Sequence, residues 1–72
     1  MTDAIRLSPR ELQVITAIAM GRTEDQIALE LGISPRTVRR YKSDIRRKCG
    51  TFSMPHTVYV VTMAGLLENV LN

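Results

Sequence analysis

Apolar residues recur at helical spacing along most of the chain, and polar capping residues mark where each run begins. The stretch from Ser8 to Glu11 reads Ser-Pro-Arg-Glu, a capping box with proline at the first helical position. Apolar side chains then follow three and four residues apart until Gly21, at Leu12, Ile15, Ile18 and Ala19. This pattern predicts a helix at about 9–20.

Two further helices are predicted on either side of Gly32. Residues 23–26 read Thr-Glu-Asp-Gln, a second capping box whose acids suit the positive end of a helix dipole. The helix predicted at 24–31 has an apolar face of Ile27, Ala28 and Leu31. We expect Gly32 to end it with a positive φ angle. Ser34 and Pro35 then open a helix at 35–49 whose core-facing stripe is Val38, Tyr41, Ile45 and Cys49, and Gly50 ends it.

A fourth helix is predicted at about 54–64, with Ser53 as its cap and Pro55 in its first turn. The positions expected to pack on the core are Val58, Val61 and Ala64. A weaker pattern allows a helical extension to about 71. The alternative for 58–61, which reads Val-Tyr-Val-Val, is a short strand packed against the helices. Because helical spacing dominates elsewhere, we predict one all-α domain over 1–72.

The small size and the few reactive residues exclude several classes of protein. One cysteine, Cys49, and one histidine, His56, can form neither an intrachain disulfide nor a zinc site. They assemble no catalytic constellation with the scattered acids, so we predict a non-enzyme without a cofactor. Cys49 is interpreted as a small buried hydrophobe and His56 as a surface residue at a helix start. Oligomerisation is the expected supplement to a marginal core.

No segment of the sequence favours export or membrane insertion. The N-terminal residues lack an apolar run of signal-peptide type. Residues 49–67 carry no formal charge, but the glycine, proline, histidine and threonines among them make this stretch too polar to span a bilayer. We therefore expect a cytoplasmic protein with no membrane partner.

Charge is distributed very unevenly along the chain. Residues 36–48 contain seven of the ten basic residues and one acid, a net charge of +6, whereas the remainder carries −3. This cationic segment follows directly on a glycine turn and a Ser-Pro helix start. An apolar helix, a turn and a cationic helix form the order of a helix-turn-helix that presents its second helix to DNA. The pattern therefore predicts double-stranded DNA as partner, with the protein located at the nucleoid.

Helical spacing also divides the cationic residues into two roles. Opposite the apolar stripe lie the candidates for base contacts in the major groove, which are Arg39, Arg40, Ser43 and, at the edge of this group, Arg36. Other residues are better placed for phosphates; these are Ser34, Thr37, Lys42, Arg46, Arg47 and, at the start of the preceding helix, Thr23. Tyr41 has two interpretations, as core filler or as a phosphate contact through its hydroxyl. The alternative for the whole face is an ordinary solvated surface, or one that binds acidic protein or lipid headgroups.

Several of these motifs together resemble the LuxR-type, or GerE-like, helix-turn-helix. The residues that carry the resemblance are Leu7-Ser8-Pro9-Arg10-Glu11-Leu12-Gln13-Val14-Ile15, Gln26-Ile27-Ala28, Leu31-Gly32-Ile33-Ser34, Thr37-Val38 and Lys48-Cys49-Gly50. The resemblance covers about 7–65. It implies a four-helix DNA-binding domain of bacterial transcription regulators, with the base-reading positions on the helix at 35–49. It also implies that the fourth helix makes dimer contacts.

The chain departs from the family pattern at three places. Tyr41 stands where the family most often has histidine, and Cys49 where it usually has leucine. Residues 54–57, Met-Pro-His-Thr, replace the usual Arg-x-Glu/Gln-Ala at the start of the fourth helix. Because most members carry a sensory or receiver domain before this module, the chain resembles a stand-alone member or a piece of a larger regulator.

The fourth helix carries more apolar side chains than the core needs. After the core positions, Tyr59, Val60, Met63, Leu66, Leu67 and Val70 are left over. Surplus apolar surface usually marks an interface, so we predict a homodimer through Tyr59, Val60, Met63 and Leu67. The alternatives are that the tail covers this surface or that another protein docks there, such as a second regulator or RNA polymerase.

The function predicted from the sequence is sequence-specific DNA binding in transcription regulation. One competing hypothesis is a protein-interaction module or anti-activator that uses the same fold and binds DNA weakly. Another is a segment like region 4 of a σ factor, which shares the helix-turn-helix and the basic reading helix.

Overall fold

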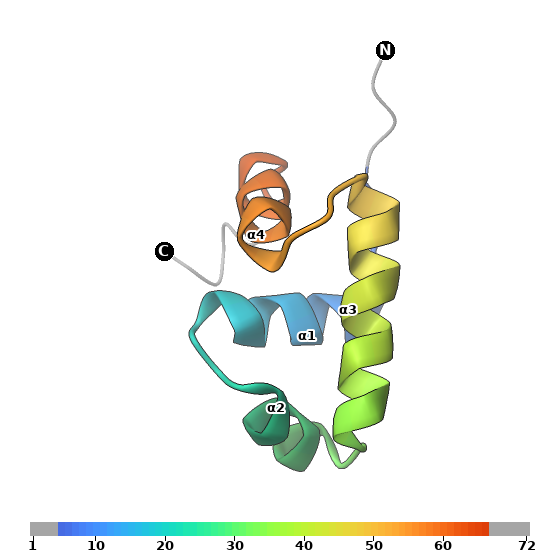
Figure 1. Cartoon of the computed structure of the whole chain (residues 1–72). Coiled ribbons are helices and arrows are strands. Elements are labelled where there is room, and N and C mark those ends of the chain that lie inside the picture. Colours follow the sequence, from blue (N-terminus) through green and yellow to red (C-terminus); the bar gives the residue numbers. More distant parts are fainter. Residues whose placement is uncertain (1–4, 67–72) are drawn as a thin grey trace.

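Four helices make up the described part of the chain, which is residues 5–66 of the computed structural model. They are α1 (Pro9–Ala19), α2 (Glu24–Leu31), α3 (Pro35–Cys49) and α4 (Met54–Met63). The long helix α3 packs against each of the other three (Figure 1). The all-α prediction is confirmed over these residues, and the strand alternative for 58–61 is wrong because this stretch lies within α4.

Each helix begins with the cap that its sequence predicts. Ser8 Oγ accepts a hydrogen bond from the Glu11 backbone N–H at 3.1 Å, and the Glu11 carboxylate accepts one from the Ser8 N–H at 2.8 Å. Thr23 and Gln26 make the same reciprocal pair at α2. Ser34 and Ser53 cap α3 and α4 with a single bond each, in which the serine hydroxyl accepts the backbone N–H of Thr37 and of His56, respectively. These bonds satisfy backbone donors that a helix start leaves without partners.

The turn between α2 and α3 depends on Gly32. Its φ of 68° lies in the left-handed region, as predicted, and such a conformation is strained for residues with a Cβ atom. The next residue, Ile33, donates its backbone N–H to the Ala28 carbonyl at 3.0 Å, which closes the end of α2. The turn thereby fixes the angle at which α3 leaves α2.

The hydrophobic core draws on all four helices. Its buried apolar members are Val14, Ile15, Ile27, Ala28, Val38, Ile45 and Val61. Burial of each large aliphatic side chain contributes about 1.5–3 kcal/mol. The predicted α3 stripe is confirmed, with Val38 and Ile45 fully buried and Tyr41 and Cys49 half-buried beside them. The sequence pattern did not single out Val14.

The end of α4 differs from the prediction. The helix ends at Met63, and Ala64 is an exposed C-cap and not a core residue. The chain turns over 64–66, where Gly65 has a φ of 80° that does not continue a helix. Thr57 takes the inward place instead and is fully buried. The extension to 71 and the role of Leu67 lie outside the described residues.

Two threonine hydroxyls make hydrogen bonds at the corner between α3 and α4. Thr57 Oγ1 donates to the Ser53 carbonyl at 2.6 Å and lies 2.5 Å from Thr51 Oγ1. Because that proton is already used, the Thr51 hydroxyl is the donor of the bond between the two threonines. Beside this corner Arg46 Nη1 lies 3.3 Å from the Met54 sulfur. Two of the residues that depart from the family pattern, Met54 and Thr57, thus make contacts at this corner.

Candidate nucleic-acid interface

The side of α3 that faces away from the core is a continuous polar and cationic surface. Arg36, Arg39, Arg40 and Ser43 are all exposed on it, whereas Val38 and Ile45 point the other way. We call these four residues the reading face. All four lie in the first nine residues of α3, and the N-terminal part of a recognition helix reaches base edges in the major groove. The helix-turn-helix brings together the residues predicted to contact bases.

The flank of α3 toward α2 is partly neutralised by an acid. Glu24, the first residue of α2, accepts hydrogen bonds from Arg39 Nη1 at 3.2 Å and from Lys42 Nζ at 2.9 Å. The Lys42 side chain keeps only 22% of its surface exposed, whereas that of Arg39 keeps 57%. Lys42, predicted to grip phosphate, is therefore already paired within the domain. The sequence analysis interpreted Glu24 only as a favourable charge in the first turn of α2.

The N-terminus of α3 is organised by its own hydroxyl groups. Ser34 Oγ accepts the Thr37 backbone N–H at 3.0 Å and shares a hydrogen bond with Thr37 Oγ1 at 2.9 Å. Thr23 Oγ1 likewise accepts the Gln26 N–H. The hydroxyls of Ser34 and Thr23 are thus engaged in helix capping, and that of Thr37 is bonded to Ser34. Thr23 accepts its capping bond and retains its own proton to donate. Of Ser34 and Thr37, one hydroxyl donates to the other and the second keeps its proton, so each helix start still offers one hydroxyl donor to a phosphate.

The remaining cations of α3 have different surroundings. Arg47 is exposed and pairs loosely with Asp44, one turn back, at 3.1 Å. Arg46 is half-buried beside Met54. Lys48 does not belong to the outer face, because its Nζ lies 2.8 Å from the buried Glu11 carboxylate of α1. The cationic segment of the sequence therefore divides into an outer face with exposed arginines and two lysines, Lys42 and Lys48, that are paired with carboxylates of other helices.

The residues expected to have structural roles occupy structural positions. Cys49 is half-buried, and burial raises the pKa of its thiol, with the nearby Glu11 charge adding to the effect. A thiol with a raised pKa is a poor nucleophile at neutral pH, which supports its interpretation as a small hydrophobe. Tyr41 is half-buried against the core, as expected of core filler. Its phosphate contact stays a prediction.

An apolar strip lies on the outward side of α4. Tyr59 and Met63 are 62% and 69% exposed, one helical turn apart, and Val60 beside them is half-buried. Phe52, just before α4, is 98% exposed, and the sequence analysis did not single it out because a loop has no periodicity to reveal its direction. These side chains lie on α4 and the preceding loop, apart from the reading face on α3.

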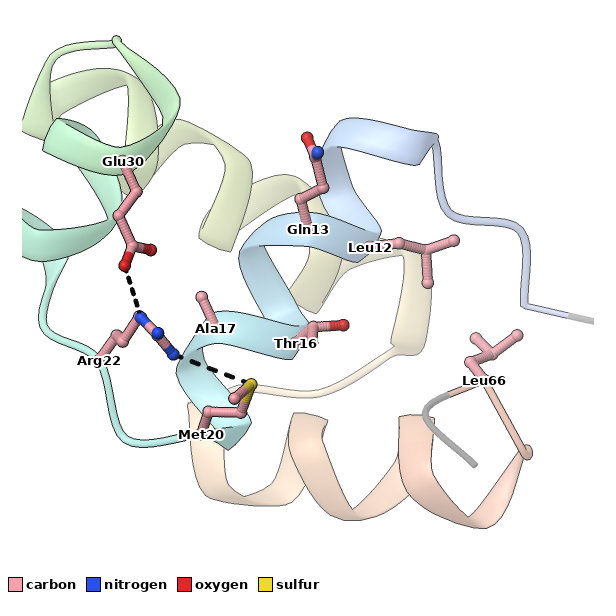
Figure 2. Close-up of a pocket in the computed structure, with 8 residues that line it drawn as sticks. All are labelled: Leu12, Gln13, Thr16, Ala17, Met20, Arg22, Glu30 and Leu66. Carbon is pink, nitrogen blue, oxygen red and sulfur yellow. Dashed lines mark hydrogen bonds and ion pairs between the residues drawn. The ribbon is translucent and has the colours of Figure 1, made fainter. Parts of the chain in front are cut away.

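A separate groove of about 500 Å³ runs along α1, away from the reading face. Its walls are Leu12, Gln13, Thr16, Ala17 and Met20, with Leu66 at one end and the Arg22–Glu30 ion pair at the other (Figure 2).

Within residues 5–66, no helix has the length and apolar character needed to cross a membrane.

Known proteins match both the sequence and this geometry. The family model of the bacterial regulatory proteins of the luxR family matches residues 6–61. The transcriptional regulatory protein FixJ of Azorhizobium caulinodans is 40% identical over 83% of this chain and 28% of its own length. The oxygen regulatory protein NreC of Staphylococcus aureus is 39% identical over 93% of this chain and 31% of its own length.

A solved structure agrees with the fold. The chain superposes on the Vibrio cholera VqmA–ligand–DNA complex with a TM-score of 0.82 and 29% identity, over 92% of this chain and 29% of that one. The chain thus spans less than a third of the length of each of these relatives. Together the family match, the four-helix fold and the cationic α3 identify a LuxR-type helix-turn-helix DNA-binding domain, and the chain belongs to the luxR family of bacterial regulatory proteins.

Proposed function

We propose that this protein binds specific sequences of double-stranded DNA as a homodimer and thereby regulates transcription. The observation that carries the proposal is the reading face, in which three exposed arginines and a serine project from one side of a helix held on a helix-turn-helix. The similarity to a regulator solved as a complex with DNA supports DNA as the ligand. DNA as ligand also implies a place in the cytoplasm, at the nucleoid.

In this proposal the two classes of contact have different tasks. Arg39, Arg40 and Ser43, with Arg36 at the edge, contact bases, because an arginine can bond guanine O6 and N7 together and so discriminate by about 1–3 kcal/mol. The phosphate contacts come from Ser34, Thr37, Arg46 and Arg47 on α3 and from Thr23 on α2. Lys42, the remaining predicted phosphate contact, is already paired with Glu24 and would have to leave that carboxylate to bind a phosphate. These contacts fix the position of α3 in the groove and supply a salt-dependent affinity for any sequence.

The homodimer in this proposal forms through α4. The exposed side chains of Tyr59 and Met63, with Val60 between them, offer an apolar strip on the side opposite the core. The predicted fourth member, Leu67, lies outside the described residues. A two-fold axis through this strip would place two reading faces on half-sites about 34–36 Å apart, so the operator would be an imperfect palindrome.

The same apolar strip supports a second candidate function. The protein would dock through α4 and Phe52 on another protein, such as a second regulator or RNA polymerase, and bind DNA only weakly. Such a module would act as an interaction partner or an anti-activator. The strength of the cationic face favours DNA as the principal ligand, since an anti-activator has no need for three exposed arginines on one helical face.

Selection from random duplex DNA tests the proposal. Purified wild type is compared with an Arg39→Ala/Arg40→Ala double variant at the same salt concentration. We expect the wild type to enrich a two-fold-symmetric motif that the double variant fails to enrich. Enrichment of an asymmetric single site would refute the homodimer on DNA. Salt-sensitive binding without any enrichment would refute sequence recognition and favour the partner-docking function.

A further inference from the structure

Glu24 reaches from the first turn of α2 to the cationic flank of α3, although its partners lie 15 and 18 residues further along the chain. One carboxylate oxygen accepts from Arg39 and the other from Lys42. Arg46 lines the same small cleft of about 140 Å³ with these three residues. One negative charge therefore lies among three positive ones at the edge of the reading face.

We propose that Glu24 is a specificity-determining residue for DNA, which holds Arg39 for base reading and withholds Lys42 from phosphates. The inference rests on the proposed function, because it assigns Glu24 a role in the selectivity of that same surface. No DNA contact by Glu24 itself is required. Glu24 is a positioning residue that acts through the two cations it holds.

The effect on Arg39 follows from the geometry of its guanidinium. A guanidinium has five N–H donors, and Glu24 takes one of them at Nη1. The other donors can still form the paired bonds to a guanine edge. A side chain that is already held loses less conformational entropy when it binds, so Glu24 favours the contact with the correct base.

The effect on Lys42 is the opposite. Affinity for any DNA sequence grows with the number of phosphates that cations neutralise. Lys42 is bonded at 2.9 Å to a carboxylate and is largely covered, so a phosphate must compete with Glu24 for it. The carboxylate also repels a phosphate that approaches the cleft. Glu24 therefore lowers the affinity for any DNA sequence more than it lowers the affinity for the correct sequence. The ratio of specific to non-specific affinity rises as a result.

The ionisation of Glu24 supports this role. The hydrogen bond from Lys42 lowers its pKa, burial opposes this, and the hydrogen bond from Arg39 lowers the pKa further. The net direction is downward, so the carboxylate is charged throughout the neutral range. The opposition to phosphate is thus always present under conditions in which the domain would bind DNA.

The matched pair of variants Glu24→Gln and Asp25→Asn tests the inference. Both remove one negative charge from the first turn of α2, but Asp25 is exposed and has no ion pair among residues 5–66. Binding is measured on a duplex of random sequence over a range of salt concentrations. We expect Glu24→Gln to bind several-fold tighter than Asp25→Asn, with a salt slope steeper by about one unit. In selection, Glu24→Gln should relax preference at the same base pair that Arg39→Ala relaxes.

Equal behaviour of Glu24→Gln and Asp25→Asn would overturn the inference and leave the proposed function intact. A wild type that binds no DNA would overturn both. If Glu24→Gln does not fold, Lys42→Gln provides the test in the wild-type background. Because Lys42 is withheld from phosphate, its loss should flatten the salt slope clearly less than the loss of Arg47 does; an equal flattening would overturn the inference.

Discussion

Glu11 Oε1 lies 2.8 Å from two donors at once, the Nζ of Lys48 and the backbone N–H of Ser8. The same carboxylate therefore completes the cap of α1 and ties the first turn of α1 to the last turn of α3. The Glu11 residue is only 4% exposed. A buried carboxylate needs such partners, because its transfer from water is costly without them.

Replacement of Lys48 by methionine should destabilise the domain at neutral pH. Glu11 would then remain buried with only its backbone partner, and we expect a loss of about 1–3 kcal/mol in the free energy of unfolding. The loss should fall toward the lower end because the Lys48 side chain is 39% exposed and partly solvated. Urea unfolding followed by circular dichroism measures it. Arg47→Met, which removes a charge one residue away, is the control and should cost less than about 1 kcal/mol.

The cost of Lys48→Met should also depend on pH. In the wild type, burial raises the pKa of Glu11, but the hydrogen bonds from Lys48 and Ser8 and the Lys48 charge outweigh this, and the pKa lies below its usual value of 4.5. The stability that this pair contributes is therefore complete above 4.5 and is lost as pH falls through the lower, folded pKa. Without Lys48 its hydrogen bond and its charge no longer lower the pKa of Glu11, which therefore lies higher than in the wild type. The difference in free energy of unfolding between Lys48→Met and wild type should become smaller as the pH falls below the folded pKa. A difference that stays constant with pH would contradict the role of the ion pair.

Loss of the Thr57 hydroxyl should weaken the corner between α3 and α4. Thr57→Val keeps the shape but leaves the buried Thr51 hydroxyl without its acceptor, at a cost of about 1–3 kcal/mol. The Thr51→Val/Thr57→Val double variant removes both hydroxyls, and the Ser53 carbonyl still accepts the Thr57 backbone N–H at 3.0 Å. We expect the double variant to be more stable than the single one. Thermal unfolding of both proteins decides, and a double variant weaker than the single one would refute this account.

The sequence predicted the helices well because local chemistry determines where they begin. Capping residues such as Ser8 and Ser34 act within one turn, so their bonds can be read from spacing alone. The fully buried Thr57 was missed for the reason that a polar residue in an apolar run carries no periodic signal. Ala64 was predicted to face the core because it continues the helical spacing of Val58 and Val61. The turn at Gly65 ends the helix before Ala64, so that spacing no longer sets the direction of its side chain.

The candidate site was predictable in part for the same reason. The outer face of α3 follows from the spacing of one helix, and the exposed positions of Arg36 and Arg40 match it. The pairing of Glu24 with Arg39 and Lys42 depends on the crossing of α2 and α3, which the local pattern does not encode. Glu11 was missed as a tertiary partner since its capping role already explained it. Contacts between helices thus mark the limit of what spacing reveals.

Removal of Arg47 should weaken binding to every DNA sequence by a similar factor. Its side chain is 71% exposed and its pair with Asp44 is an i,i+3 surface contact, so it is available for phosphate. We expect Arg47→Gln to flatten the dependence of log K on log salt by about one unit and to leave base preference unchanged. Titration of a selected and a random duplex measures both. A change confined to the selected duplex would instead place Arg47 at a base edge.

A negative charge on the outward strip of α4 should abolish the proposed homodimer. Met63 is 69% exposed and lies one helical turn from Tyr59, so Met63→Glu would place a carboxylate at the centre of an apolar contact, and Val60→Glu serves as a second variant. Thr62→Glu is the matched control, because Thr62 is an exposed residue of the same helix that already carries a polar side chain. Sedimentation should show dimers for the wild type and the control but monomers for Met63→Glu. Both the control and Met63→Glu should keep their helical content, since neither change touches the buried Val61. A wild type that sediments as a monomer at high micromolar concentration would refute dimerisation through α4 in the absence of DNA and make the strip available to a different protein.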